Sequence, residues 1–308
     1  MAQRKLRIAV GGIHFPLSMM SYFLRAFDRR DDVELWKFGP FSGTYIPWNS
    51  GMHINSKYVV TPDFALPQSS IGTNPPAAII DTQMPWTPDL TILIDAGWHT
   101  KDRPRGNIVA HVQTDPHVLK ATYNAPKLYS DLNFCMQKVY MEYDEIYLPY
   151  AYDPTVHYPM PEVTKEYDAC LIGLNYDKRA SLIRGLQSHN LRIKSGIGLV
   201  FDEYRMAYNQ SKVALSWSSL LDIPARVFEG MAMGLPLVAN RLPDMPLFFE
   251  EGVDYLGFDT EQEAIKQVLH LLVDDEYSYK IATNGYNKVK QHTWDARVQT
   301  ILEHAKLV

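Results

Sequence analysis

The sequence is poor in cysteine and has no long apolar run. Cys135 and Cys170 are its only cysteines, too few for a thiolate metal site and uninformative about a disulfide, so a reducing cytoplasm is the expected compartment. Nowhere do about 18 apolar residues run together, and no apolar stretch follows the basic residues near the first methionine. We therefore expect neither a membrane span nor secretion.

Signatures of several other protein classes are also missing. The sequence has no GxxxxGK[ST] motif, and the glycines after its first predicted strand do not form a GxGxxG fingerprint. These absences disfavour P-loop NTPases and dinucleotide-dependent dehydrogenases. The formal net charge is −5 and neither half is strongly basic, so charge gives no indication of nucleic-acid binding.

Length and patterning indicate two α/β domains. A chain of 308 residues exceeds a comfortable single core and suggests two domains of about 150 residues each. Predicted strands alternate with helices, which is typical of parallel sheets covered on both faces. A proline-rich piece at 153–161 is the expected linker. The expected segments are strands at 5–10, 33–38, 90–94, 108–112, 146–150, 169–172, 235–239 and 254–259, and helices at 17–27, 261–273 and 295–307.

The most informative stretch is RVFEGMAMGLPLVANR, from Arg226 to Arg241. Pro224 suits a first helical turn and Gly234 a helix end, with a buried strand after it. Arg226 and Glu229 lie three apart and project from the same side of this helix. The carboxylate of Glu229 can accept two hydroxyl protons of a ribose diol, and Arg226 can meet a phosphate with a planar set of donors. The alternative is an Arg–Glu pair that braces a buried helix.

Two loops add further candidates. Gly11 and Gly12 follow the first predicted strand just before a helix, where backbone amides can approach a diphosphate. The alternative is a tight turn with no ligand. Asp115 and His117 follow another buried strand, at the edge where α/β sheets bind ligands. Here the alternative is that Asp115 caps a helix from Pro116.

The 226–241 stretch closely resembles the carboxy-terminal half of the GT-B glycosyltransferases, in particular the spore-maturation-protein-like branch of the group 1 enzymes. That pattern is an Arg, one residue, Phe-Glu, a small-residue helix, Gly and a strand. The resemblance covers roughly residues 140 to 308. It extends over Ile172-Gly173, Tyr176 to Arg179, Tyr208 to Leu215, Glu250 to Gly252, Lys280 to Gly285 and His292 to Arg297.

The resemblance implies a GT-B fold, an α/β architecture with two Rossmann-like doubly wound domains facing a central cleft. It places an acceptor-side domain at 1–154 and a nucleotide-sugar donor domain at 165–292, and implies that a helix at 293–308 packs back on the first domain. The implied activity is transfer of a sugar from a nucleotide-diphosphate sugar to an unknown acceptor, with retention of configuration. The implied enzyme is a cytoplasmic hexosyl- or related transferase.

The resemblance also assigns roles to residues. Glu229 would bind the nucleotide ribose, and Asp115 and His117 would be the catalytic candidates that touch the donor sugar. No Asp-x-Asp triplet occurs, which removes the usual metal site of GT-A enzymes, so we expect no metal or other cofactor and a charge clamp of basic groups instead. For Lys178 and Arg179 the alternative is a solvated helix start. The donor-phosphate candidates are Gly11, Gly12, Lys178, Arg179 and Arg226, and the donor-sugar loop is Asn240, Arg241, Leu242, Pro243 and Asp244.

The sequence departs from the group 1 pattern in two places. Leu221 stands where many members have a first glutamate, seven residues before the one that matches Glu229, although the spore-maturation-like branch tends to lack it. The usual glycine pair is missing from the 240–244 loop, so the sequence does not indicate which sugar the donor carries. An aromatic stretch at 36–58, including Tyr45 and Trp48, either stacks on the acceptor or completes a core. Two other functions stay open, a nucleotide-sugar epimerase and a non-catalytic sugar-nucleotide-binding protein.

Overall fold

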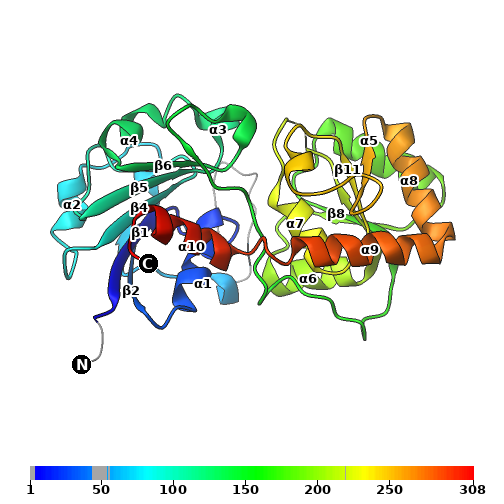
Figure 1. Ribbon diagram of the computed structural model, residues 1–308, viewed down its shortest axis with the longest axis horizontal. Coiled ribbons are helices and arrows are strands. Elements are labelled where there is room, and N and C mark those ends of the chain that lie inside the picture. Colours follow the sequence, from blue (N-terminus) through cyan, green and yellow to red (C-terminus); the bar gives the residue numbers. More distant parts are fainter. Residues whose placement is uncertain (1–3, 44–53, 55, 219) are drawn as a thin grey trace. The chain divides into compact units, whose positions relative to one another are not determined.

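The computed structural model describes residues 4–43, 54, 56–218 and 220–308, which form two compact units (Figure 1). Unit 1 is Met1–Pro149 with Trp294–Val308, and unit 2 is Tyr150–Thr293. The sequence predicts the corresponding boundaries at 154, 165 and 292. Within the described ranges, no helix has the length and apolar character needed to cross a bilayer.

Unit 1 is built on a parallel sheet of seven strands in the order β3-β2-β1-β4-β5-β6-β7. The interior strand β1, between β2 and β4, is fully buried at Ile8, Ala9 and Val10, as expected for a strand covered on both faces. The order reverses direction between β1 and β4, which makes their carboxyl ends the topological switch point. The strands are β1 (Leu6–Gly12), β2 (Val33–Pro40), β3 (Phe64–Leu66), β4 (Leu90–Asp95), β5 (Ile108–Gln113), β6 (Leu132–Cys135) and β7 (Ile146–Tyr147), and the helices are α1 (Met19–Asp28), α2 (Ala77–Asp81), α3 (Pro116–Leu119), α4 (Asn124–Tyr129) and α10 (Trp294–His304).

The glycine pair belongs to β1 rather than to a turn. The strand continues through Gly12 and α1 begins only at Met19, so the prediction that these glycines form a turn directly before a helix is wrong. A Cβ on Gly11 would lie 2.4 Å from the Phe38 ring, and a Cβ on Gly12 would lie 2.7 Å from the Ile94 carbonyl oxygen. The missing side chains therefore allow β2 and β4 to pack closely on β1.

Helix α10 packs on α1 within unit 1, although the whole of unit 2 separates them in the sequence (Figure 1). Trp294 is fully buried, and its ring lies 5.7 Å from that of Tyr22 and 5.0 Å from that of Phe23. Arg29 forms a bidentate ion pair with Asp295 at 2.7 Å. The helix thus attaches to unit 1 through aromatic packing and a half-exposed ion pair.

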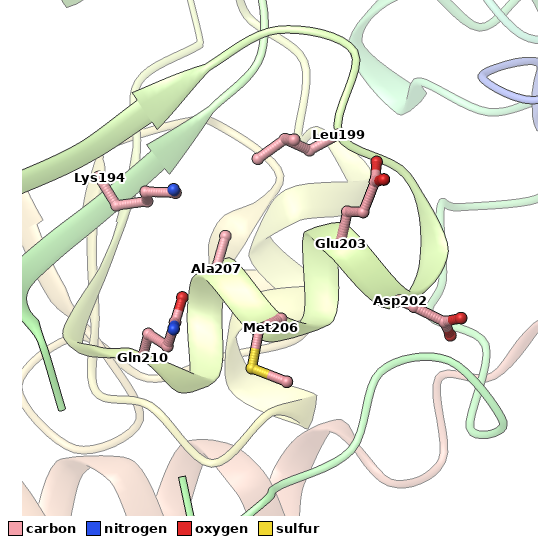
Figure 2. A pocket seen from close by; sticks show the side chains of 7 residues that line it. All are labelled: Lys194, Leu199, Asp202, Glu203, Met206, Ala207 and Gln210. Carbon is pink, nitrogen blue, oxygen red and sulfur yellow. The ribbon is translucent and has the colours of Figure 1, made fainter. Parts of the chain in front are cut away.

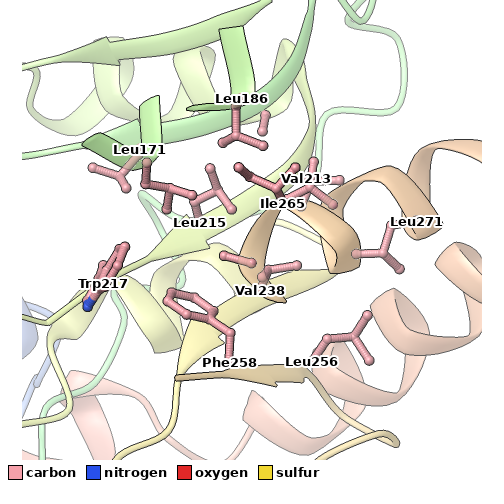
Figure 3. Packing of buried hydrophobic residues seen from close by; sticks show 14 of the residues in the cluster. Leu171, Leu186, Val213, Leu215, Trp217, Val238, Leu256, Phe258, Ile265 and Leu271 are labelled. Atoms are coloured by element: carbon pink, nitrogen blue, oxygen red, sulfur yellow. The ribbon is translucent and has the colours of Figure 1, made fainter. Parts of the chain in front are cut away.

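Unit 2 is built on a parallel sheet of five strands in the order β12-β11-β10-β8-β9. Leu171, Val213, Leu215, Val238 and Phe258 belong to its buried hydrophobic core (Figure 3). The strand order reverses between β8 and β10, which is the switch point of this unit. The strands are β8 (Tyr167–Ile172), β9 (Ile193–Gly196), β10 (Ser211–Ser216), β11 (Leu237–Asn240) and β12 (Leu256–Phe258), and the helices are α5 (Asp177–Ser188), α6 (Phe201–Asn209), α7 (Ala225–Ala232), α8 (Glu261–Val273) and α9 (Asp275–Val289).

The aromatic stretch is described only in part. Trp36 and Phe38 are buried in β2 and their rings stack at a centroid distance of 5.3 Å, which confirms the core interpretation for these two residues. Tyr45 and Trp48 lie outside the described residues.

Candidate functional site

Two guanidinium groups converge on Gly173, the residue that follows β8 at the switch point of unit 2. Gly173 has a φ of 135°, a conformation that L side chains rarely adopt. A Cβ there would lie 2.7 Å from Nη2 of Arg226 and 3.6 Å from Nη1 of Arg179. The absence of a side chain at Gly173 therefore makes room for both cations.

Arg179 is held in place at the first turn of α5. Its Nε donates a hydrogen bond to the Trp217 carbonyl at 2.6 Å, and its Nη1 donates to the Leu174 carbonyl at 2.8 Å. Burial, and secondly the positive charge of Arg226, lower the pKa of Arg179 to about 10, so the group stays charged at neutral pH. The first N–H groups of a helix lack intrahelical partners and favour anions, so this arginine adds to an electropositive helix start.

Among the residues that the structure describes, no carboxylate forms an ion pair with Arg226 within 4 Å. Its Nε donates to the Ile172 carbonyl at 2.8 Å, while its Nη1 is buried with no hydrogen-bond partner among the residues described. No ion pair within 4 Å joins Arg226 to Glu229, both of which the structure describes, so the interpretation of these two residues as a bracing pair is wrong. A buried donor without an acceptor costs about 1 to 3 kcal/mol, which an anion bound at Arg226 would recover.

Lys178 is more loosely placed than the two arginines. Its side chain is exposed, and its Nζ lies 6.0 Å from the ring centroid of Trp217. It follows Asp177 in the first turn of α5, so it adds positive charge at the same helix end.

Glu229 is buried in α7, with 6% of its surface exposed. The hydroxyl of Tyr204 donates a hydrogen bond to its Oε2 at 2.7 Å, and Nε2 of His157 lies 3.7 Å from its Oε1. Burial raises the pKa of Glu229 to about 7, against the opposing effects of the Tyr204 hydrogen bond and the Arg226 charge. The carboxyl group therefore titrates near neutral pH.

His157 and Tyr204 were not predicted from the sequence. His157 comes from the piece assigned as a linker, in which the Asp153 side chain accepts hydrogen bonds from the backbone and the hydroxyl of Thr155. An Asp-Pro-Thr sequence favours such a local turn, and that turn was the available signal. Tyr204 lies on a helix with no distinguishing motif.

The predicted catalytic residues of unit 1 lie in a polar network after β5. Asp115 precedes α3 as expected, but its side chain makes no capping hydrogen bond, so the capping interpretation is wrong. Its carboxylate accepts from the Thr114 hydroxyl. Nδ1 of His117 forms a hydrogen bond of 2.9 Å with Oε1 of Gln137. The contact of Asp115 and His117 with a donor sugar stays a prediction.

A buried Asp–His pair beside this network was also not predicted. Oδ2 of Asp95 lies 3.1 Å from Nε2 of His111, and both side chains are fully buried. The other Asp95 oxygen accepts from the backbone N–H groups of Gly97 and Trp98. Asp95 thus fixes the loop after β4. The available signal was a charged residue at the end of an apolar strand.

The predicted donor-sugar loop is tied to its own unit. The Asn240 Oδ1 accepts from the Ser218 N–H at 2.8 Å, and Arg241 forms ion pairs with Glu251, Asp259 and Glu263. These three carboxylates compensate the Arg241 charge. Leu242 and Asp244 are buried, whereas Pro243 is exposed.

Open pockets occur elsewhere on unit 2. One of about 430 Å³ is lined by residues of β9 and α6, including Lys194, Glu203 and Met206 (Figure 2). Another of about 440 Å³ is lined by Phe248, Phe249 and neighbouring residues. Neither lining includes Arg179, Arg226 or Glu229, so the candidate site rests on side-chain chemistry rather than on pocket size.

Comparison with known proteins gives a family match for part of the chain and similar solved structures for the whole. Residues 156–303 match a family model described as glycosyl transferase-like. The solved structure of Anabaena HepE in complex with UDP and glucose is similar with a TM-score of 0.68 and 11% identity, covering 98% of this chain and all of that one. The fold is GT-B. Residues 156–303 are thus similar to glycosyl transferases, and the whole chain shares the GT-B fold.

Other GT-B structures with different activities are also similar. An alpha-glucosyltransferase in complex with UDP and DNA aligns with a TM-score of 0.67 and 11% identity, covering 98% of this chain and 100% of that one. A UDP-N-acetylglucosamine 2-epimerase aligns with a TM-score of 0.56 and 13% identity, covering 99% and 98%. No curated protein sequence matches the chain. At these identities, the structural likeness establishes the fold alone.

Proposed function

We propose that the chain is a retaining glycosyltransferase of the spore-maturation-protein-like branch of group 1, which transfers a hexosyl or related sugar from a nucleotide-diphosphate sugar to an acceptor still to be identified. The observation that carries the proposal is the unpartnered, buried Nη1 of Arg226 beside Arg179 at the start of α5. The glycosyl transferase-like match over this unit supports it, as do the similar structures that were solved in complex with UDP.

In this proposal the two arginines bind the diphosphate. When the bond between sugar and diphosphate breaks, negative charge grows on the leaving phosphate, and preorganised cations stabilise that charge. Lys178 and the N-terminus of α5 add to the positive potential. The fixed cations then stabilise the leaving diphosphate in place of the divalent metal that other transferases use, so the reaction needs no metal.

Glu229 binds the ribose in the same proposal. An ionised carboxylate accepts hydrogen bonds only, with lone pairs on both oxygens, and so suits two neighbouring hydroxyl donors. Asp115 and His117 contact the donor sugar, as do Asn240 and its neighbours through Asp244. These last contacts rest on the family resemblance.

Nucleotide-sugar epimerisation is the second candidate, because a 2-epimerase is among the similar structures. An epimerase would bind the same donor and return a nucleotide sugar with changed stereochemistry. A transferase instead releases free nucleoside diphosphate. Chromatography of the nucleotide products separates the two.

Arg226→Ala tests the proposal, with Arg184→Ala as the matched control because Arg184 is exposed on α5. Loss of Arg226 should weaken binding of UDP, measured by calorimetry, and slow release of nucleoside diphosphate from a nucleotide sugar by tens to hundreds of fold. Arg184→Ala should retain both. Normal binding by a folded Arg226→Ala protein, across a panel of nucleoside diphosphates, would refute the proposed phosphate site.

A further inference from the structure

The carboxylate of Glu229 is approached from two other segments of unit 2. Tyr204 of α6 donates to its Oε2 at 2.7 Å, and the His157 ring, from the segment before β8, faces its Oε1 at 3.7 Å. His157 is 1% exposed and its ring meets that of Tyr204 edge-on, with centroids 5.7 Å apart. The three side chains therefore form one packed group.

The orientation of His157 follows from its other ring nitrogen. Nδ1 accepts a hydrogen bond from the backbone N–H of Asp153 at 3.1 Å, so in the neutral ring the proton resides on Nε2. That N–H is the group that faces Oε1 of Glu229. The Tyr204 hydroxyl thus donates a hydrogen bond to one carboxylate oxygen, and the His157 ring packs beside the other at a distance too long for a hydrogen bond.

We propose that Tyr204 and His157 are positioning residues, which fix the carboxylate plane of Glu229 so that one lone pair on each oxygen remains for the hydroxyls of a nucleotide ribose. The inference rests on the proposed function for its ligand. Its structural part, a hydrogen bond from Tyr204 and a ring contact from His157 at 3.7 Å, rests on the contacts alone. A carboxylate oxygen accepts more than one hydrogen bond, so the supports do not exclude the ligand.

The arrangement also couples ribose binding to pH. The titratable and charged groups that face Glu229 are Tyr204 and Tyr208 of α6, Arg226 of α7 and His157. Donors to a carboxylate favour its ionised form, and so does the Arg226 charge, whereas burial opposes it. Removal of a donor should therefore raise the pH at which Glu229 loses its proton and becomes able to accept both hydroxyls.

The first experiment follows the Glu229 carboxyl group in the free, full-length protein. Infrared difference spectra against Glu229→Gln give the pH midpoint of this group. Tyr204→Phe should raise the midpoint by about one unit or more, since hydrogen bonds to charged groups are worth about 1.5 to 3 kcal/mol. His157→Phe removes only a ring contact at 3.7 Å and should shift the midpoint less than Tyr204→Phe does. Tyr255→Phe, a buried tyrosine on another segment, is the control.

The second experiment measures ribose recognition. Affinities for UDP-glucose and for its 2′-deoxyuridine counterpart are compared by calorimetry between pH 6 and 9, since neither probe changes charge on its diphosphate in this range. In Tyr204→Phe the preference for ribose should fall several-fold at pH 7 and recover at pH 9, where Glu229 is ionised. A purely structural role would lower affinity equally at every pH.

The outcomes separate the two hypotheses. An unchanged carboxyl midpoint in a folded Tyr204→Phe protein would overturn the positioning role. A raised midpoint with no ribose preference even in the unmodified protein would leave the positioning of Glu229 standing and would refute its proposed role in ribose binding.

Discussion

At the scale of single residues, Glu229 combines two opposed demands. To accept hydrogen bonds from two ribose hydroxyls, as we propose, the carboxylate must be ionised, yet burial in α7 raises its pKa to about 7. The Tyr204 hydroxyl and the Arg226 charge reduce that cost without removing it. An ionisable group at this buried position therefore lowers the free energy of unfolding at the pH values at which Glu229 is ionised.

Glu229→Gln should remove this cost. The folded pKa of Glu229 is raised from 4.5 to about 7, so the folded state binds the proton more tightly than the unfolded state. Its contribution to stability is complete below about pH 4.5 and is lost as pH rises through about 7. As the pH rises from 5 to 8, the free energy of unfolding of the wild type should therefore fall by up to about 3 kcal/mol relative to that of the variant.

Urea unfolding at both pH values measures the difference. Glu250→Gln, at an exposed position, is the control and should behave like the wild type. Equal pH dependence in Glu229→Gln and the wild type would show that this carboxyl does not titrate as described.

The sequence identified Arg226 and Glu229 because both lie in one short motif. It did not identify Tyr204 or His157, since their contacts with Glu229 form only when α6 and the segment before β8 fold against α7. The lack of an ion pair between Arg226 and Glu229 was likewise not predictable, because their i, i+3 spacing indicates one. The tertiary contact with the Ile172 carbonyl overrides that spacing.

At the scale of elements, the hydrophobic periodicity predicts which helices and strands exist better than it predicts the residues at which they end. The helix expected at 261–273 is confirmed residue for residue as α8, and Gly234, with a φ of 73°, follows α7 as expected. The strand predicted at 5–10 continues two residues further, to Gly12, as β1. Gly11 and Gly12 indicate a turn in isolation, whereas here they make room for neighbours, and packing of that kind leaves no local signal.

Trp294→Ala should test how strongly α10 is attached. The ring is fully buried between Tyr22 and Phe23, so its truncation should destabilise unit 1 by about 3 to 5 kcal/mol. Arg29→Ala removes only the half-exposed pair with Asp295 and should cost about 1 kcal/mol or less. Chemical denaturation of both variants gives the comparison, and equal losses would contradict the dominance of aromatic packing.

At the scale of the whole molecule, the two units share a parallel α/β architecture but carry different chemistry. The cations at Gly173 and the buried Glu229 belong to unit 2, whereas Asp115 and His117 belong to unit 1. Fold class followed from the strand and helix alternation, which depends on local sequence. The proposed roles, with phosphate and ribose binding in unit 2 and contacts with the donor sugar in unit 1, depend on side chains, and the roles in unit 1 came from the family resemblance.

Turnover should be independent of divalent metal. If Arg179 and Arg226 stabilise the leaving diphosphate, excess EDTA should leave the rate of nucleoside diphosphate release within about twofold of the untreated value. The assay uses whichever nucleotide sugar the protein consumes. Loss of activity in EDTA with recovery in manganese would assign the leaving-group role to a metal instead.

The chain enters and leaves unit 2 at neighbouring points. The backbone N–H of Tyr152 donates to the His292 carbonyl at 3.1 Å, and Tyr152 pairs with Thr293 in an isolated parallel bridge. Since α10 completes unit 1 only after this point, a ribosome produces every residue of unit 2 before the helix that covers Tyr22 and Phe23. Domains generally fold as units during synthesis, so we expect unit 2 to complete its fold before unit 1. Until α10 is made, the aromatic side chains that it covers in unit 1 stay accessible to chaperones.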